Sequence, residues 1–260
     1  NFSYTVTVFD PDVGGTDFAP TSVAGSSAPA VGVANTYSVA QPGFTSGFDW
    51  RALQAGAFTK TYDAEAGLDG LTAITTGGYS VVQNIAVGTG GSSYRLTHFN
   101  PRSNQVLLLP ETFLVGANDA AITFQSRLGI VTAIETARVQ VSLDDGVSWI
   151  DVFSQSGTSP TNTNQPPTTD AAFVPRAISL TAFAGRTVRV RLQFASGANG
   201  VTFNPTDVNT VGWFIDNLTL AGVQRVTSVA TARVLSDATF AFTPATAGSS
   251  KPAISPAATR

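Results

Sequence analysis

The stretch that decides the fold is "ARVQVSLDDGVSWIDVF", residues 137–153. Apolar residues alternate with polar ones from Val139 to Leu143, the period-2 pattern of a strand with one buried face. The Asp-Gly pair at 145–146 follows, and Asp-Gly is a frequent hairpin turn because glycine adopts positive φ at little cost. The chain then returns through a second apolar run. The stretch therefore predicts a β-hairpin in an antiparallel sheet.

The same alternation recurs in "TVRVRLQF" (187–194), where Arg189 and Arg191 fall on the polar side. Two more continuously apolar stretches, "NQVLLLPETFLV" (104–115) and "AAITFQSRLGIV" (120–131), are typical of central strands. Turn residues separate these segments, and helical periodicity is nearly absent. The sequence therefore predicts an all-β fold, an antiparallel jelly-roll-like β-sandwich with an N-terminal β extension.

Three regions differ in composition. Residues 1–65 contain a strand and then a strand–turn–strand pattern within 26–53, which resembles part of a PKD- or Ig-like module. Residues 66–242 carry the strands of the expected sandwich. Residues 243–260 are rich in Pro, Ala, Ser and Thr, so we expect an extended tail or linker.

The chain can bury a large core but carries little charge. Of its 260 residues, 43% are hydrophobic, and the mean hydropathy is +0.14. Charged residues make up 12%, against about 25% in a typical domain. A net charge of −3 and only two lysines, Lys60 and Lys251, leave no basic patch for nucleic acid. We therefore expect no nucleic-acid partner.

Cysteine is absent, which excludes disulfides, thiolate zinc sites and cysteine nucleophiles. No stretch approaches the roughly 20 apolar residues of a membrane-spanning helix, so we expect no membrane span. A surface rich in Thr, Ser, Asn and Gly and poor in lysine suits an exported protein. We expect a secreted or cell-surface protein of bacterial type.

Several motifs share a resemblance. "VSLDDGVSW" (141–149) resembles the hairpin of secreted bacterial jelly-roll modules, namely the MAM-like modules and the accessory domains of immune-inhibitor-A-type peptidases. "VGWFIDNLTL" (211–220) resembles their closing strand, and "YRLTHFNP" (94–101) and "ISLTAFAGRTVRVRLQF" (178–194) resemble two further segments. The resemblance spans residues 85–222 in the same order. The MAM cysteines are missing, so it is to the bacterial members, and it implies a non-catalytic accessory sandwich.

A carboxylate occupies an apolar row in the expected closing strand. Strict alternation places Asp216 on the same side as Phe214, Leu218 and Leu220. A buried carboxylate costs several kcal/mol unless it is paired. Asp216 therefore needs partners, and loop N–H groups, Arg191 or a metal ion are the candidates.

Calcium is the metal that such oxygen-rich segments favour. Asp207 and Asn209 precede Asp216 and offer oxygen ligands, while Asp144 and Asp145 form a pair at the hairpin turn. A Ca²⁺ ion is thus one interpretation. The other is that Asp216 is held by hydrogen bonds alone and that Asp144 and Asp145 belong to an ordinary turn.

No catalytic set emerges from the sequence. His98 is the only histidine, and neither a G-x-S-x-G elbow nor an HExxH motif accompanies it. The glutamates are Glu65, Glu111 and Glu135, and no pair of them can be argued for glycoside cleavage. We predict that the protein is not an enzyme.

Two segments are candidate binding regions: an aromatic segment and the first strand. Phe44, Phe48 and Trp50 lie in a looser segment and are the candidates for an exposed carbohydrate platform. Trp149 and Trp213 sit at strand positions, where we expect them in the core.

The first strand, residues 2–9, contains Tyr4, Val6 and Val8 on one face. It either pairs with an exposed sheet edge of a neighbouring copy or folds back on its own sandwich. The predicted function is a non-catalytic extracellular adhesion or assembly module whose partner is a second copy, as a homo-oligomer or filament. The alternative is a carbohydrate-binding accessory module of a larger secreted hydrolase or peptidase, with an extracellular glycan as partner.

Overall fold

The structure is a computed structural model. It describes residues 23–25, 30, 32–39, 48–76, 78–85, 90–97, 103–160, 168–196, 210–234, 239–243 and 252–256. In these ranges the regular secondary structure is β except for one helical element, the 3-10 turn η1 (Thr181–Phe183).

Three antiparallel sheets contain all the named strands. The large sheet has eight: in spatial order β11 (Ile150–Ser156), β10 (Glu135–Ser142), β13 (Thr187–Ser196), β8 (Gln105–Val115), β15 (Val223–Val234), β3 (Phe48–Ala57) and β17 (Pro252–Pro256), with β5 (Thr72–Ile74) also on β8. The second sheet has six: β12 (Val174–Ser179), β9 (Ala121–Leu128), β14 (Trp213–Ala221), β7 (Ser93–Leu96) and β6 (Val82–Gln83), with β4 (Thr61–Tyr62) on β14. A small sheet joins β1 (Val23–Ala24), β2 (Asn35–Val39) and β16 (Thr239–Phe242).

The large and second sheets pack as a sandwich, which confirms the predicted all-β antiparallel fold. From β8 to β10 and again from β12 to β15 the chain passes from one sheet to the other at each strand, as in a jelly roll. The 104–115 and 120–131 segments supply β8 and β9, and both are central strands as expected.

Alternation accounts for the sandwich core. On β13, Val188, Val190, Leu192 and Phe194 are buried in the core, while Arg191 on the opposite face is partly exposed. The second sheet contributes inward-facing side chains in the same way. They include Ile122, Phe124, Leu128, Trp213, Ile215, Leu218 and Leu220.

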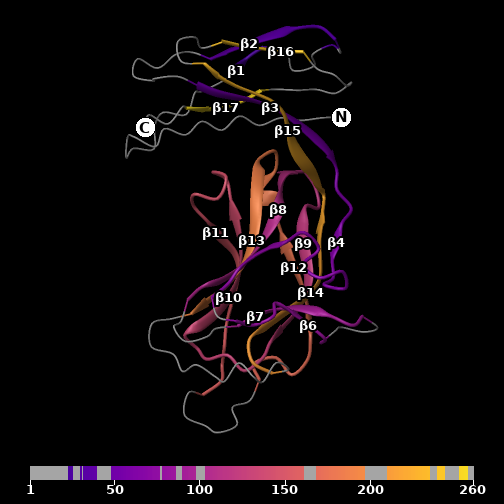
Figure 1. The fold of residues 1–260 in the computed structure, drawn as a ribbon, viewed down its shortest axis with the longest axis vertical. Coiled ribbons are helices and arrows are strands. Elements are labelled where there is room, and N and C mark those ends of the chain that lie inside the picture. Colours follow the sequence, from indigo (N-terminus) through magenta and orange to yellow (C-terminus); the bar gives the residue numbers. More distant parts are fainter. Residues whose placement is uncertain are drawn as a thin grey trace.

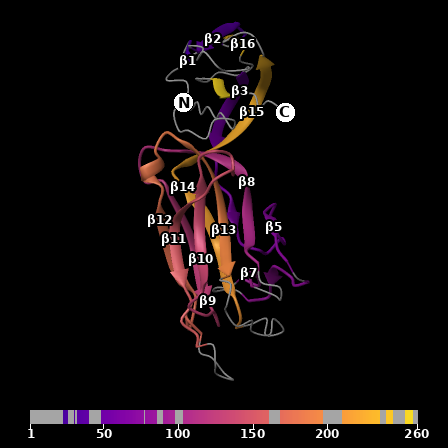
Figure 2. The same cartoon turned by 90° about the vertical axis from the view of Figure 1, so that its left-hand side faces the viewer.

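The molecule is elongated, because two long strands extend beyond the sandwich (Figure 1). β15 has 12 residues, of which only Val223–Val226 pair with β8, while the register with the 10-residue β3 runs from Gln224 to Val234. β3 lies in the predicted 1–65 segment, yet it is part of the large sheet. β17, from the predicted tail, pairs with β3 at the edge of this sheet. Figure 2 shows β10, β11 and β13 side by side along the long axis.

The prediction that Asp216 shares one strand face with Phe214, Leu218 and Leu220 is wrong, because β14 contains a bulge. Its register with β9 shifts between Asp216 and Thr219, and Asn217 has a φ of 51°. The bulge brings Leu218 and Leu220 onto the same face as Trp213 and Ile215, all four in the core. Phe214 and Asp216 therefore lie on the outer face of the second sheet.

On that outer face Phe214 is fully buried between two arginines. It pairs with Arg95 of β7 on one side and Arg127 of β9 on the other. Their guanidinium carbons lie 5.8 Å and 5.6 Å from the centre of the Phe214 ring. Arg95 also donates from Nε to the carbonyl of Val211 at 2.7 Å. These cation–π contacts explain how an aromatic ring is buried on the outer side of a sheet.

Candidate functional site

Polar side chains gather on the outer face of the large sheet, beside the predicted hairpin. In the β10–β13 register, Gln140 lies opposite Arg191 and Ser142 lies opposite Arg189. Neighbouring residues such as Val141 and Val190 face the core, so this polar set faces outward. We call it the arginine face. Its members are Arg138, Gln140, Trp149, Asp151, Arg189 and Arg191.

A continuous chain of hydrogen bonds crosses three strands of the arginine face. Arg138 Nη1 donates to Asp151 Oδ2 at 2.7 Å, and Gln140 Nε2 donates to Asp151 Oδ1 at 2.6 Å. The Oε1 atom of Gln140 then accepts from Arg191 Nε at 2.7 Å. Asp151 thus fixes the Gln140 amide, and that amide fixes the rotation of the Arg191 guanidinium.

Trp149 lies under Arg191. The guanidinium carbon is 4.1 Å from the centre of the indole, and the indole N–H donates to the Gly146 carbonyl at 3.0 Å. Burial lowers the pKa of Arg191, while the charge of Asp151 acts in the opposite direction. The prediction that Trp149 is a core residue is wrong, because it is partly exposed and outside the core cluster. The same prediction for Trp213 is confirmed.

The hairpin carboxylates have separate contacts. Asp145 and Gly146 supply the positive-φ positions of the turn, with φ of 59° and 98°. Asp144 accepts from Ser142 Oγ at 2.7 Å, from the Ser148 N–H at 2.8 Å and 3.0 Å, and from the Ser148 hydroxyl. Burial acts to raise the pKa of Asp144, but these hydrogen bonds outweigh burial and lower it. Asp145 instead lies 3.6 Å from Arg189 Nη1. Through its hydrogen bonds to Ser142 and Ser148, Asp144 stabilises the turn.

Asp216 is 3% exposed, and its Oδ1 atom accepts from the main-chain N–H of Asn217 at 2.7 Å. Arg191 is not its partner, because Arg191 belongs to the arginine face of the other sheet. Asp207 and Asn209 lie outside the described residues. Within those residues, no three His, Cys, Asp or Glu side chains lie close enough to hold a metal ion. The calcium site stays a prediction.

The three glutamates serve different local contacts. Glu65 accepts from the N–H groups of Gly91 and Ser92 at 2.6 Å and 2.9 Å. Glu111 accepts from the hydroxyl of Tyr62 at 2.5 Å. Glu135 accepts from the N–H and hydroxyl of Thr132 at 2.9 Å and 3.0 Å. His98 lies outside the described residues.

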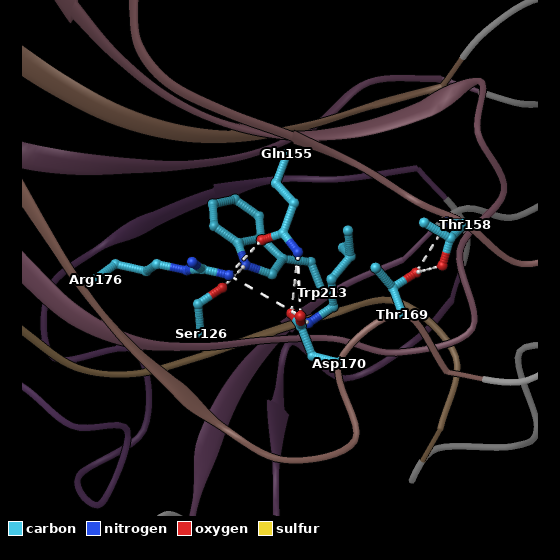
Figure 3. A network of polar contacts seen from close by, with 8 residues as sticks. Ser126, Gln155, Thr158, Thr169, Asp170, Arg176 and Trp213 are labelled. Atoms are coloured by element: carbon cyan, nitrogen blue, oxygen red, sulfur yellow. Dashed lines mark hydrogen bonds and ion pairs between the residues drawn. The ribbon is translucent and has the colours of Figure 1, made fainter.

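A second polar network closes one side of the sandwich (Figure 3). Arg176 on β12 donates to Gln155 Oε1 on β11 at 2.8 Å, and Gln155 Nε2 donates to Asp170 at 3.2 Å. Asp170 also accepts from the Leu128 N–H at 2.8 Å. β11 and β12 are edge strands of the two sheets, so this network is a structural cross-link.

The remaining predicted binding and assembly residues fall outside the described set. Tyr4, Val6, Val8 and Phe44 are among the residues not described. Phe48 and Trp50 lie on β3, but their side chains are not described either.

The arginine face was not predicted from the sequence. The available signal was three outward-facing arginines within two alternating strands of a chain that has only 14 basic residues. The register that places Gln140 opposite Arg191 is a tertiary property, because residues 51 positions apart meet there.

None of the described segments is a helix of the length and apolar character that a membrane crossing requires. No protein-family model matches the chain, so the resemblance to MAM-like and immune-inhibitor-A-type modules stays a prediction. No curated protein matches either.

Seven chains of known structure match. One is the K2 cleaved adhesin domain of Lys-gingipain, with 13% identity over 62% of this chain and 88% of that chain, at a TM-score of 0.34. Another is the K1 cleaved adhesin domain of Lys-gingipain from Porphyromonas gingivalis W83, with 14% identity over 76% of this chain and 100% of that chain, at a TM-score of 0.30. TM-scores this low do not establish a shared fold.

Proposed function

We propose that the protein is a non-catalytic extracellular adhesion or assembly module that joins copies of itself by pairing of terminal strands. One observation carries this proposal. β17, close to the C-terminus, forms the edge of the large sheet by pairing with β3 over five residue pairs, from Pro252↔Ala52 to Pro256↔Phe48.

An edge strand of this kind can be exchanged between copies. β17 contacts the large sheet through a single neighbour, so its removal leaves the other pairs of that sheet intact. Pro252 and Pro256 lack an N–H, which suits an edge strand and discourages a further strand on its outer side. In an assembled state, β17 of one copy pairs with β3 of the next, as in domain swapping. Strand 2–9, with Tyr4, Val6 and Val8, is the second candidate donor.

The test is light scattering after size-exclusion chromatography of the full chain over a range of concentrations. We expect oligomers whose population rises with concentration and falls when residues 252–260 or residues 2–9 are deleted. A deletion of 257–260 leaves β17 whole and is the matched control. A full chain that stays monomeric throughout, or oligomers that survive both deletions, would contradict the proposal.

A second candidate function, carbohydrate binding, is supported by a different observation. The arginine face combines a partly exposed indole with fixed amide and guanidinium groups on rigid strands. Aromatic faces and fixed hydrogen-bonding groups are the parts from which small-ligand sites are built. This surface, rather than the predicted Phe44, Phe48 and Trp50 platform, is the one on which we base this candidate.

A further inference from the structure

Among the residues that the structure describes, no carboxylate contacts Arg191 of the arginine face. Arg138 pairs with Asp151 at 2.7 Å, and Arg189 pairs with Asp145 at 3.6 Å. Among the described residues, Arg191 has only the neutral amide of Gln140 and the indole of Trp149 as hydrogen-bonding or ring partners. Asp151 uses its two oxygens on Arg138 and Gln140 instead. The charge of Arg191 is therefore available to a ligand.

The donors of Arg191 are available as well. A guanidinium carries five N–H donors, and the Gln140 bond uses the one on Nε. In the described part of the chain, the Nη1 and Nη2 atoms of Arg191 have no hydrogen-bond acceptor. Neither atom belongs to the set of side-chain nitrogens and oxygens that are buried without a partner. Both atoms thus reach solvent. Two adjacent terminal nitrogens form the planar fork that binds a carboxylate through two parallel hydrogen bonds.

The guanidinium is also held in place before any ligand arrives. The Trp149 ring fixes its plane from below, and the Gln140 amide, itself held by Asp151, fixes its rotation. An arginine fixed in this way loses little side-chain entropy on binding. Partial burial also strengthens its attraction for an anion, since less water screens the pair.

The geometry of the surface selects the class of ligand. The arginine face is the face of a sheet, and the main-chain groups of β10 are already engaged by β11 and β13 on its two sides. An extended peptide, which binds sheets through main-chain hydrogen bonds at an edge, finds none on this face. A sugar acid presents hydroxyls and a carboxylate, which side-chain amides, guanidinium groups and an indole can recognise.

We propose that the arginine face binds an acidic oligosaccharide, with a sugar carboxylate on the Nη1 and Nη2 atoms of Arg191 and a sugar ring against the exposed part of Trp149. This inference rests on the second candidate function, carbohydrate binding, and names its ligand class. Gln140 and Asp151 are positioning residues, because they act through the orientation of Arg191.

Calorimetric titration of the full chain with galacturonate and mannuronate trimers tests the proposal, with the methyl esters of the same trimers as uncharged counterparts. We expect the esters to bind at least about tenfold more weakly, since esterification removes the charge-assisted hydrogen bonds. Binding of the acids should weaken as salt concentration rises.

Three variants locate the site. Arg191→Gln should weaken binding of the acidic trimers about tenfold or more, while Arg191→Lys should retain part of it, because lysine keeps the charge but not the fork. Arg186→Gln makes the same charge change at an exposed turn outside the arginine face and should leave binding unchanged. If Arg191→Gln fails to fold, the loss of fork geometry in Arg191→Lys provides the same measurement.

Four outcomes would overturn the inference. Two concern the ligand: equal affinity for the acidic trimers and their esters, and binding of polyglutamate, an acidic peptide, as tightly as the acidic trimers. The other two are unchanged binding of the acidic trimers by both Arg191 variants, and no binding of any trimer by the full chain. Equal affinity for acid and ester would leave carbohydrate binding itself standing. No binding of any trimer would remove that second candidate too. The strand-exchange proposal is judged separately, by the oligomeric state.

Discussion

The Nη2 atom of Arg176 on β12 donates to the Oε1 atom of Gln155 on β11, 2.8 Å away, and so links the edge strands of the two sheets. Arg176 also stacks over Phe153, with its guanidinium carbon 5.6 Å from the ring centre. We expect Arg176→Ala to lower the free energy of unfolding by about 1–2 kcal/mol, because a charged hydrogen bond and a cation–π contact are lost together. Urea unfolding measures this loss. Arg186→Ala, at an exposed turn, should change the free energy by less than about 0.5 kcal/mol. Equal effects of the two changes would show that the cross-link contributes nothing.

The bulge in β14 depends on the left-handed backbone of Asn217. Its side chain is exposed and its φ is 51°, a region that asparagine and glycine tolerate and β-branched residues avoid. Asn217→Val should therefore lower the free energy of unfolding by about 1–2 kcal/mol, whereas Asn217→Gly should change it by only a few tenths. Thermal unfolding of the two variants makes the comparison. Identical melting temperatures would mean that the bulge does not constrain this residue.

Gly129 is packed against the backbone of Thr210. A Cβ atom at position 129 would lie 2.0 Å from the Thr210 carbonyl oxygen, so the two chain segments must move apart to accept it. We expect Gly129→Ala to cost about 1–3 kcal/mol in denaturant unfolding. Gly78→Ala is the matched control, because a Cβ there meets nothing within 4 Å. The prediction fails if both alanine variants unfold at the wild-type denaturant concentration.

Two buried tyrosines, Tyr62 and Tyr94, and the partly buried Tyr79 make the fold sensitive to alkali. Burial raises the pKa of Tyr79 to about 12, and burial together with hydrogen bonds to Glu111 and Asp69 raises the pKa of Tyr62 and Tyr94 further. Folding thus favours the neutral phenols. Their contribution to stability is complete below about pH 10, the pKa of an unfolded tyrosine, and is lost as pH rises towards the folded pKa values.

We expect unfolding at high pH to be cooperative and to coincide with phenolate absorbance from these tyrosines. Tyr79→Phe should reduce the alkaline loss of stability, because phenylalanine has no proton to release. Phenolate absorbance that rises gradually near pH 10 while the near-ultraviolet circular dichroism stays native would contradict this prediction.

The predicted calcium site at Asp207, Asn209 and Asp216 has a direct test. A chelator should lower the melting temperature by roughly 5–10 °C, and added Ca²⁺ should restore it, since an ion that binds only the folded chain stabilises it. Asp216→Asn should abolish the response to Ca²⁺, whereas Asp144→Asn should retain it, because Asp144 is engaged by Ser142 and Ser148. An unchanged melting temperature removes the site.

The sandwich could be predicted because its strands obey local alternation. The β10 and β13 faces follow from Val139, Val141, Val190 and Leu192 without any knowledge of pairing. The same rule failed at Asp216, because one bulge residue reverses every later side chain of the strand. The prediction that Trp149 is a core residue failed for a related reason. A tryptophan beside a turn enters the core only if its side chain points between the two sheets, and alternation does not determine that next to a turn.

By itself, the sequence determined the all-β class, the hairpin at 144–146 and the inward faces of the central strands. These properties depend on the residue and its near neighbours. Only the tertiary structure decided the bulge at Asn217, the burial of Phe214 between Arg95 and Arg127, and the stacking of Arg191 on Trp149. Each of those depends on which strands pair and in which register, and long-range packing selects that register from many that local preference allows.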